Sequence, residues 1–444
     1  MKHIYPAHAY SMGPIRECYW AEDVSSETLA RPPAQGSLRT RTVIIGAGFT
    51  GLNAALRLAE AGEDVVVLEA EFPGFGASGR NGGFCCLGGA RISDAGLLSL
   101  YGQTGPQAVR RAEVGAIAHV DGLLTRHGWD VDRHSHGETI MAHTAAKMDS
   151  LRSWAAECEA DYGAPAQVIE KDALRAHGMN GTFEGAVSHP MGFALHPRKY
   201  LAGLLGAAEA AGAVVHGASP VLETRQVADG WVLKTPQAEV TADRLIVATN
   251  GYSSEDLPRW MRGRYLPAQS SVIATRVMTE EELERQGWTT RQMCYEDRRL
   301  LHYFHLTPEG RMVFGQRGGI RSHPLIEKSL QRKVRADFDR LFPDWRGVET
   351  PYYWSGMVCI TGSLMPFCGA IPGARNAYAA FGYHGNGVAM GSLCGAAVAD
   401  LARAGETDLP LPAFFGDTPR RMPPGRLRRL ALLADYSWAT LTRG

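Results

Sequence analysis

A glycine-rich turn that joins an apolar run to an amphipathic segment is the clearest place where this chain could do chemistry. Residues 43–45 lead into Gly46-Ala47-Gly48-Phe49-Thr50-Gly51, which has the G-x-G-x-x-G spacing. In a strand–turn–helix unit the first glycine permits the tight turn, the second lets a pyrophosphate approach the backbone, and the third lets helix and strand pack closely. A helical pattern follows at residues 52–59, and the free N–H groups at its start would attract phosphates.

An acidic residue follows where a dinucleotide-binding unit requires one. The second apolar run, residues 65–68, ends at Glu69, whose carboxylate can hold both hydroxyls of an adenosine ribose. A structural βαβ unit with a chance glycine spacing is the alternative, but strand, glycines, helix, strand and acid all occur in order. The nucleotide contacts predicted from this unit are Gly46, Gly48, Phe49, Thr50, Gly51, Glu69 and Ala70.

The glycine-rich loop at residues 75–83 favours FAD over NAD. In a plain NAD domain the chain would continue into another helix and strand, whereas this loop suits a backbone pressed against a flat cofactor. Three of its side chains offer hydrogen-bond donors, and a flexible loop without function is the alternative. The cofactor contacts predicted from this loop are Ser78, Gly79, Arg80, Asn81, Gly82 and Gly83.

A second glycine-rich junction lies near the carboxyl end. A strand at residues 379–381 runs into glycines, and a helix at residues 388–403 then begins with small residues and no capping side chain. Its free N–H groups and positive dipole end could face the pyrimidine side of a flavin, where the reduced form carries its negative charge. A plain glycine-rich loop is the alternative. The predicted contacts are Gly382, Gly385, Asn386, Gly387 and Val388.

Residues 267–353 change to alternating strands, which predicts an antiparallel sheet that could cover a cofactor. In residues 300–306, Tyr303 and His305 point to one face while His302 and Phe304 point to the other, and the pattern leaves open which face meets the cofactor. Tyr303 and His305 are candidate catalytic residues. Arg311 and Arg317 could pair with a substrate carboxylate, although hairpin arginines are often solvated, and Trp354 lies nearby as a further candidate for substrate contact.

Composition excludes several classes of protein. The 444 residues carry 46 Lys and Arg against 46 Asp and Glu, so no basic field would attract nucleic acid. No stretch approaches the roughly 18 apolar residues of a membrane helix, and the N-terminus lacks the apolar part of a signal peptide. The eight cysteines are scattered without metal spacing, and His134-x-His136 lacks further ligands, so we expect a cytoplasmic protein with no metal site.

These stretches together resemble the D-amino-acid oxidase-type family of FAD amine oxidoreductases, over nearly the whole chain. The shared motifs are VIIGAGFTGL with Glu69, GFGASGRNGG, IVATNGY and the glycine-rich junction before the last helix. Within the family the resemblance is closest to gamma-glutamylputrescine oxidase and its relatives, which share the segment Cys18-Tyr19-Trp20-Ala21. The resemblance implies further FAD contacts at Val221, Thr249, Asn250 and Gly251.

The fold that the resemblance implies is α/β (α+β overall), with a discontinuous Rossmann-type FAD-binding domain interleaved with a substrate domain that contains an antiparallel sheet. The change of pattern at residue 267 points to the same organisation. The expected parts are an N-terminal extension (1–37), the FAD-binding domain (38–105, 190–256 and 354–410), the substrate-binding domain (106–189 and 257–353) and a C-terminal helical tail (411–444).

The sequence departs from the family at two places near the flavin. Relatives usually have Gly-Tyr-Ser-Gly-His-Gly where this chain has Gly-Tyr-His-Gly-Asn-Gly, so the imidazole of His384 has moved by two positions. His384 is nevertheless the candidate for proton transfer, with a structural histidine as the alternative. Phe84 replaces a common glutamine and would make the substrate pocket more apolar. Since no histidine lies in residues 78–83 and Cys359 does not align with the cysteine that binds flavin in some relatives, we expect non-covalent FAD.

The activity that the resemblance implies is oxidation of an amine or amino-acid-like C–N bond by hydride transfer to flavin N5. The imine would hydrolyse to an aldehyde or keto acid, and O2 would reoxidise the flavin and form H2O2. A dehydrogenase that passes electrons to a quinone or carrier protein, and a catalytically idle flavin-binding subunit, remain alternatives. The expected partners are a small-molecule amine and O2 or another acceptor, and the identity of the amine and the oligomeric state stay open.

Overall fold

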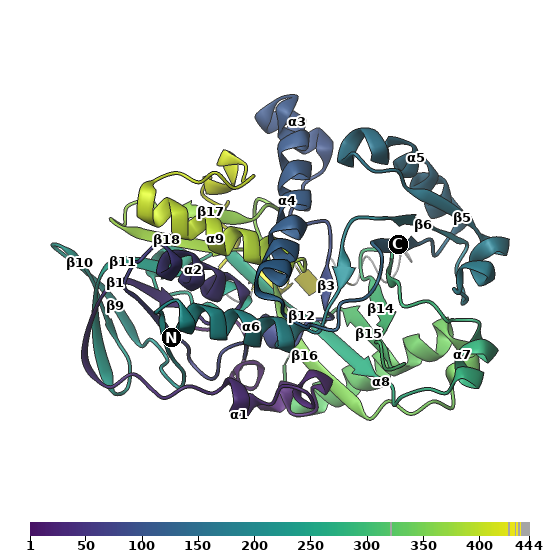
Figure 1. The fold of residues 1–444 in the computed structure, drawn as a ribbon, viewed down its shortest axis with the longest axis horizontal. Coiled ribbons are helices and arrows are strands. Elements are labelled where there is room, and N and C mark those ends of the chain that lie inside the picture. The colour runs from purple at the N-terminus through teal and green to yellow at the C-terminus, as the bar shows by residue number, and fades with distance from the viewer. Residues whose placement is uncertain (320–321, 425–426, 431, 434–435, 437–444) are drawn as a thin grey trace.

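The strands of the computed structural model form two large sheets, which lie side by side along the long axis of the molecule (Figure 1). The structure describes residues 1–319, 322–424, 427–430, 432–433 and 436. The strands of the first sheet are β1 (Gly36–Ile45), β2 (Val65–Leu68), β8 (Val214–His216), β9 (Glu223–Val227), β10 (Gly230–Lys234), β11 (Ala238–Val247), β17 (Phe367–Ala370) and β18 (Ala377–Phe381).

The core of the first sheet follows from the apolar run before the glycine motif. β1 lies between β11 and β2 in parallel register, and β8 and β18 extend the parallel ladder on either side. Ile44 packs toward a layer of helices, while Val43 and Ile45 pack toward the β9–β10 hairpin. Both faces are covered here, which is why residues 43–45 at the end of β1 and the whole of β2 are continuous apolar runs.

The helix layer on the first sheet is built by α2, α6 and α9, and α4 packs against α9. α2 and α9 approach closely, since a Cβ on Gly395 would lie 2.3 Å from the backbone oxygen of Thr50. The helices of the chain are α1 (Ser26–Leu29), α2 (Phe49–Glu60), α3 (Asp94–Tyr101), α4 (Thr104–His127), α5 (Ala145–Tyr162), α6 (Pro197–Ala210), α7 (Glu280–Gln286), α8 (Pro324–Leu341) and α9 (Ala389–Ala404). Among the described residues, no helix has both the length and the apolar character that crossing a bilayer requires.

The second sheet is antiparallel except where β4 pairs with β13. Its order is β16-β12-β15-β14-β13-β4-β6-β5. Its strands are β4 (Glu138–Met141), β5 (Gln167–Glu170), β6 (Gly185–His189), β12 (Tyr265–Ala274), β13 (Met293–Glu296), β14 (His302–Leu306), β15 (Met312–Arg317) and β16 (Tyr352–Thr361). A small third sheet pairs β3 (Phe84–Cys85) with β7 (Phe193–Ala194).

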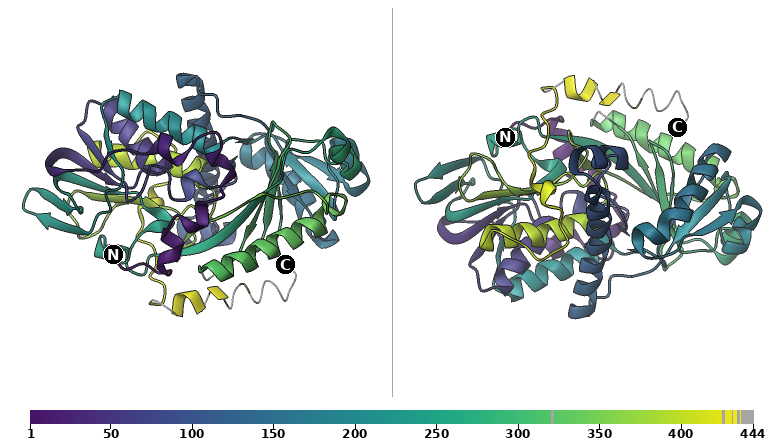
Figure 2. Two further views of the ribbon diagram at one scale, coloured as in Figure 1. Left: turned by 90° about the horizontal axis from the view of Figure 1, so that it is seen from below. Right: turned by 90° about the horizontal axis from the view of Figure 1, so that it is seen from above.

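α8 packs on one face of the second sheet (Figure 2) and so shows which side chains of the sheet lie on the covered face. Phe304 and Phe314 form an aromatic cluster with Phe338 of α8, and His302 lies on the same side. Tyr303 therefore points to the opposite face, which meets the first sheet. This settles the question that the alternating pattern of residues 300–306 leaves open.

Three expected domain boundaries fall inside structural elements. The boundary between residues 37 and 38 lies within β1, which starts at Gly36. The boundary at residue 354 lies within β16, which pairs with β12 from end to end and so belongs to the second sheet. The boundary between residues 105 and 106 lies within α4. The division into an FAD-binding and a substrate-binding part stays a prediction, with β16 moved to the second part.

The two ends of the chain pack against the body of the protein. Tyr19 of the expected N-terminal extension donates a hydrogen bond to Glu309, and Trp20 donates one to the backbone oxygen of Asn81, so this segment contacts both halves. In the expected C-terminal tail, Arg428 is buried and pairs with Glu255 at 2.8 Å. Residues 425–426, 431, 434–435 and 437–444 of that tail lie outside the described residues.

Candidate active site and cofactor cavity

A cavity of about 730 Å³ lies where the carboxyl ends of β1 and β2 meet the second sheet. Its volume is in the range of ligand-binding cavities. Segments far apart in the sequence converge on it, as the glycine motifs predict. The predicted cofactor residues that line it are Gly46, Gly48, Phe49, Thr50, Glu69, Ala70, Ser78, Arg80, Asn81, Gly82, Val221, Thr249, Asn250, Gly385, Asn386, Gly387 and Val388.

The first glycine motif has the geometry that its spacing predicts. Gly46 has φ +103°, a conformation that favours glycine, and a Cβ on it would lie 2.9 Å from the backbone oxygen of Ala248. A Cβ on Gly51 would lie only 1.8 Å from the backbone oxygen of Gly46. Because these glycines have no side chains, a ligand can approach the backbone at the start of α2, where the N–H groups fit the phosphates of a dinucleotide.

Glu69 lies in the cavity wall at the end of β2. One carboxylate oxygen accepts a hydrogen bond from the backbone N–H of Ala47 at 2.8 Å, and the other accepts one from Glu71 at 3.3 Å. Burial raises the pKa of Glu69, and these backbone hydrogen bonds act against that rise. The carboxylate is held in place beside the glycine turn, where it fits a ribose.

The loop at residues 75–83 is held together by its own polar side chains. The Arg80 guanidinium donates to the backbone oxygens of Phe75 at 2.9 Å and Ser355 at 3.1 Å. The Asn81 amide donates to the backbone oxygens of Ala77 and Ser78. These hydrogen bonds order the loop, and Ser78, Arg80, Asn81 and Gly82 are among its residues that line the cavity.

The second glycine-rich junction also reaches the cavity. Gly385, with φ +113°, leads to α9, which begins without a side-chain cap. The Asn386 amide donates to the backbone oxygen of Leu87 at 2.7 Å and contacts the Cys86 sulfur at 3.2 Å. The open N-terminal turn of α9 therefore offers N–H groups and a positive dipole end to a ligand.

Five predicted cofactor glycines lie behind the cavity wall. An added Cβ on any of them would approach a backbone oxygen or a side chain within 3.1 Å. They shape the wall through close packing and do not line the cavity themselves. These residues are Gly51, Gly79, Gly83, Gly251 and Gly382.

His384 does not line the cavity. Its Nδ1 donates to the backbone oxygen of Gly89 at 2.7 Å, and its Nε2 accepts from the backbone N–H of Thr361 at 3.2 Å. Burial lowers the pKa of His384 to about 4, so the imidazole is neutral near pH 7. The positive φ of +51° accompanies this inward placement. The geometry corresponds to the structural alternative rather than to proton transfer.

The two other catalytic candidates share a sheet face but differ in access. Tyr303 lines the cavity, with its hydroxyl 3.1 Å from Ser270 Oγ and its ring against Phe84, which also lines the cavity. His305 is buried behind that wall, with Nε2 2.9 Å from the backbone oxygen of Gly82 and Nδ1 2.9 Å from His134. Burial lowers the pKa of His305 to about 3, so it is also neutral.

The two candidate arginines lie at opposite ends of β15. Arg317 lines the cavity and donates to the backbone oxygen of His384 at 2.9 Å. Burial lowers the pKa of its guanidinium to about 10, and no carboxylate lies within 4.0 Å of it among the described residues. It remains charged near pH 7, and this free positive charge suits a substrate carboxylate.

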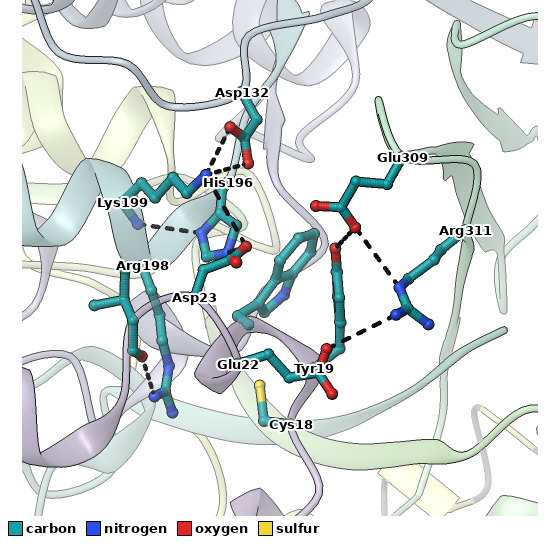
Figure 3. Close-up of polar contacts among 12 residues, drawn as sticks. Cys18, Tyr19, Glu22, Asp23, Asp132, His196, Arg198, Lys199, Glu309 and Arg311 are labelled. Carbon is teal, nitrogen blue, oxygen red and sulfur yellow. Dashed lines mark hydrogen bonds and ion pairs between the residues drawn. The ribbon is translucent and has the colours of Figure 1, made fainter. Parts of the chain in front are cut away.

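Arg311 does not line the cavity. Figure 3 shows its contacts with acidic residues instead. Its guanidinium approaches Glu22 at 3.9 Å and Glu309 at 3.6 Å and packs on the rings of two tyrosines. The hairpin turn carries it toward the N-terminal segment, away from the cavity. Trp354 is also outside, buried, and donates its indole N–H to the backbone oxygen of Arg80 at 2.8 Å.

An acidic cluster next to the N-terminal segment already contains a protein cation. Asp23, Asp132 and His196 place their ligand atoms within 4.8 Å of one another. Lys199 lies between them, with its ammonium 2.7 Å from Asp132 and 4.0 Å from Asp23 (Figure 3). His134 hydrogen-bonds to His305, while His136 is exposed.

Several cavity residues were not predicted from the sequence. Glu138 and Tyr295 of the second sheet line the cavity, as do Met1, His3 and Tyr10 of the N-terminal segment. An acidic residue at the start of the otherwise apolar strand 138–141 is the one signal that could have drawn attention to Glu138. The N-terminal residues carry no pattern that indicates a ligand.

Acid denaturation is expected to release FAD into solution. Cys359 borders the cavity, but its side chain packs in an apolar cluster with Val43 and Phe381, and burial raises the pKa of its thiol. A thiolate, the reactive form, is therefore disfavoured. After acid precipitation the flavin absorbance should be found in the supernatant. If the colour stays in the pellet of the wild type but not of Cys359→Ser, the expectation is wrong and Cys359 is the attachment point.

Comparisons with known proteins agree with the fold and the cavity. The family model for FAD dependent oxidoreductases (DAO) matches residues 41–401. The chain is 29% identical over 438 residues to the probable oxidoreductase OrdL of Rhizobium meliloti (strain 1021), covering 96% of this chain and 98% of that protein. It is 30% identical over 368 residues to the gamma-glutamylputrescine oxidoreductase of Escherichia coli (strain K12), covering 83% and 84%.

The structure is also similar to that of glycine oxidase from Geobacillus kaustophilus, with a TM-score of 0.72 and 21% identity. The match covers 87% of this chain and 100% of the other. It confirms the predicted fold class, in which a Rossmann-type nucleotide-binding sheet is combined with an antiparallel sheet. The bare glycine turns, the carboxylate of Glu69 and the open helix ends fit FAD. The chain belongs to the FAD-dependent oxidoreductase family.

Proposed function

We propose that the protein oxidises the C–N bond of a small amine or amino acid. Bound FAD would supply the acceptor for a hydride from the carbon next to nitrogen, and O2 would be the final electron acceptor, with formation of H2O2. The resulting imine is hydrolysed by water to an aldehyde or keto acid and ammonia or a smaller amine. The observation that carries this proposal is the single cavity that joins the nucleotide-binding glycine turns to a sheet face bearing Tyr303 and Arg317.

The residues of the chain act by binding and orientation. Arg317 supplies a positive charge for a substrate carboxylate, and Phe84 with Tyr303 forms an aromatic wall beside it. The N-terminal turn of α9 stabilises negative charge that develops near it. His384 holds this junction to Gly89 and Thr361.

The names of the relatives support an amine as the substrate. One relative is a gamma-glutamylputrescine oxidoreductase, another is the glycine oxidase of Geobacillus kaustophilus, and a third, matched over 54% of this chain, is the mitochondrial dimethylglycine dehydrogenase of Homo sapiens. All three names refer to molecules that contain an amine nitrogen. Phe84 in the cavity wall and His384 behind it depart from the sequences of the relatives, so the proposal names a class of amine rather than one compound.

An anaerobic amine screen tests the proposed function. Purified holoenzyme is mixed with gamma-glutamylputrescine, putrescine, glycine, dimethylglycine and proline in turn, and loss of the oxidised flavin absorbance is recorded. At least one amine should bleach the flavin. Admitting air should then restore the colour with one H2O2 formed per amine oxidised, whereas a dehydrogenase would need a quinone or carrier protein. Absence of bleaching by every amine would favour a catalytically idle flavin-binding subunit.

The cellular location stays a prediction. All eight cysteines are free and buried, which is compatible with the cytoplasmic location expected from their spacing.

A further inference from the structure

Glu138 is a buried carboxyl group in the wall of the cavity, on the side of the second sheet. It begins β4, is 4% exposed and lines the cavity together with Cys86 and Tyr295. Its place is set by pairing with Met293 on one side and His189 on the other. Gly137 before it has φ +88°, and a Cβ there would lie 1.8 Å from the backbone oxygen of His189, so this position admits little movement.

No lysine or arginine lies within 4.0 Å of the Glu138 carboxylate in the described part of the chain. The nearest basic group is His189 Nε2 on β6, at 3.7 Å from the carboxylate. Burial lowers the pKa of His189 to about 4, so it is neutral near pH 7. A buried carboxylate without a cation is costly, and one that faces a cavity can obtain the missing positive charge from a ligand.

The other titratable groups that face Glu138 are also neutral near pH 7. Burial raises the pKa values of the Cys86 thiol after β3 and of Cys294 and Tyr295 on β13. Burial raises the pKa of Glu138 itself to about 8, while hydrogen bonding to Cys86 acts in the opposite direction. The carboxyl group can therefore gain or lose a proton in the physiological range.

The other acids at this end of the cavity are already paired with protein groups. Glu296 is paired with His302 and Arg298, and Asp297 lies 3.5 Å from Lys147. His384 and His305 do not reach the cavity. Glu138 is thus the acid here that has no cationic partner among the described residues.

We propose that Glu138 binds the ammonium form of the incoming amine and takes its proton. One N–H bond of the substrate breaks and one O–H bond of the Glu138 carboxyl forms, with no change of oxidation state. The amine is left neutral, with the lone pair that oxidation requires, and Glu138 is left as the neutral acid that its apolar surroundings favour. This inference rests on the proposed function, and it makes Glu138 a catalytic residue.

The test is the pH dependence of anaerobic flavin reduction in Glu138→Gln holoenzyme. The probe is whichever amine of the screen reduces the wild type fastest, used below saturation between pH 6 and pH 10. The variant should be about 10- to 100-fold slower at pH 7, since it loses one charge-assisted hydrogen bond to the substrate. The deficit should shrink toward about pH 10, where alkylamines lose their proton in solution. The wild-type rate should level off near pH 8, and that of the variant should keep rising.

Glu113→Gln is the matched control. Glu113 on α4 is also buried, with a pKa that burial raises to about 7, but it bonds to Tyr162 and does not line the cavity. Its pH profile should equal that of the wild type. If Glu138→Gln fails to hold FAD, Glu138→Ala is tested with added formate, which should restore reduction at pH 7 while chloride should not.

The outcomes separate this inference from the proposed function. If Glu138→Gln equals the wild type at pH 7, or is slower by the same factor at every pH, Glu138 is not the proton acceptor although the enzyme oxidises amines. Lack of formate rescue in the alanine variant would mean the same. If no amine reduces the wild-type flavin, the proposed function itself is wrong and this inference falls with it.

Discussion

The Gly51→Ala variant is expected to purify without its flavin colour. The added methyl carbon would lie 1.8 Å from the backbone oxygen of Gly46, far inside van der Waals contact, and no side-chain rotation can relieve this clash because the backbone fixes the positions of both atoms. α2 would have to shift from β1, and its N–H groups would leave the position that the phosphates require. We expect FAD affinity to fall by at least about 100-fold, and overpacking to cost about 1–3 kcal/mol in the free energy of unfolding.

The measurement is the FAD content of the purified variant, followed by titration of the apoprotein with FAD and by denaturant unfolding. Gly206→Ala is the matched control, because Gly206 lies inside α6 and a Cβ there would meet no atom within 4 Å. That variant should keep its FAD and gain up to about 1 kcal/mol in stability from better helix propensity. A yellow Gly51→Ala protein with normal FAD affinity would show that α2 does not hold the dinucleotide.

The Arg317→Met variant is expected to lose preference for amines that carry a carboxylate. Arg317 is charged, lines the cavity and has no carboxylate partner among the described residues, so a substrate carboxylate would gain charge-assisted hydrogen bonds from it. Removing the charge should lower kcat/KM for glycine or gamma-glutamylputrescine by about 100-fold. Methylamine and putrescine, which lack the carboxylate, should change by less than about 3-fold, within the range of a side chain that makes no specific contact.

Glycine is compared with methylamine, and gamma-glutamylputrescine with putrescine, on the same enzyme preparation. The ratio of the two kcat/KM values within each pair cancels differences in FAD content. Arg311→Met serves as the control. It lies near the other end of the same hairpin and was an equal candidate from the sequence, yet its guanidinium contacts Glu22 and Glu309 outside the cavity. Its ratios should match those of the wild type. Equal losses for both members of a pair in Arg317→Met would mean that Arg317 holds the His384 junction and does not recognise a carboxylate.

The nucleotide end of the molecule could be predicted closely from the sequence because its requirements are local. Whether a glycine is needed at Gly46, Gly48 or Gly51 depends on a turn, a helix start and an adjacent strand that are neighbours in the chain. The position of Glu69 follows from the length of one βαβ unit. The same reasoning placed Gly385 and Asn386 at the cavity, since a glycine junction before an uncapped helix has few other geometries.

The substrate end depended on tertiary structure. Alternation places Tyr303 and His302 on opposite faces, but only the packing of α8 decides which face is covered. Arg311 and Arg317 are equally good candidates in sequence, and the way the two sheets dock determines which end of β15 reaches the cavity. His384 illustrates the same limit, because its imidazole bonds to Gly89, which lies far away in the chain.

The sequence alone therefore determined the cofactor, the nucleotide-binding unit and the fold class, since each depends on backbone conformation over a few tens of residues. The tertiary structure alone decided which side chains meet in the cavity. Glu138 shows why: its strand pairs in parallel with β13, more than a hundred residues away, and its charge has no partner only because of what surrounds it there. Local steric rules can be read along a chain, whereas burial and charge balance arise only where distant segments come together.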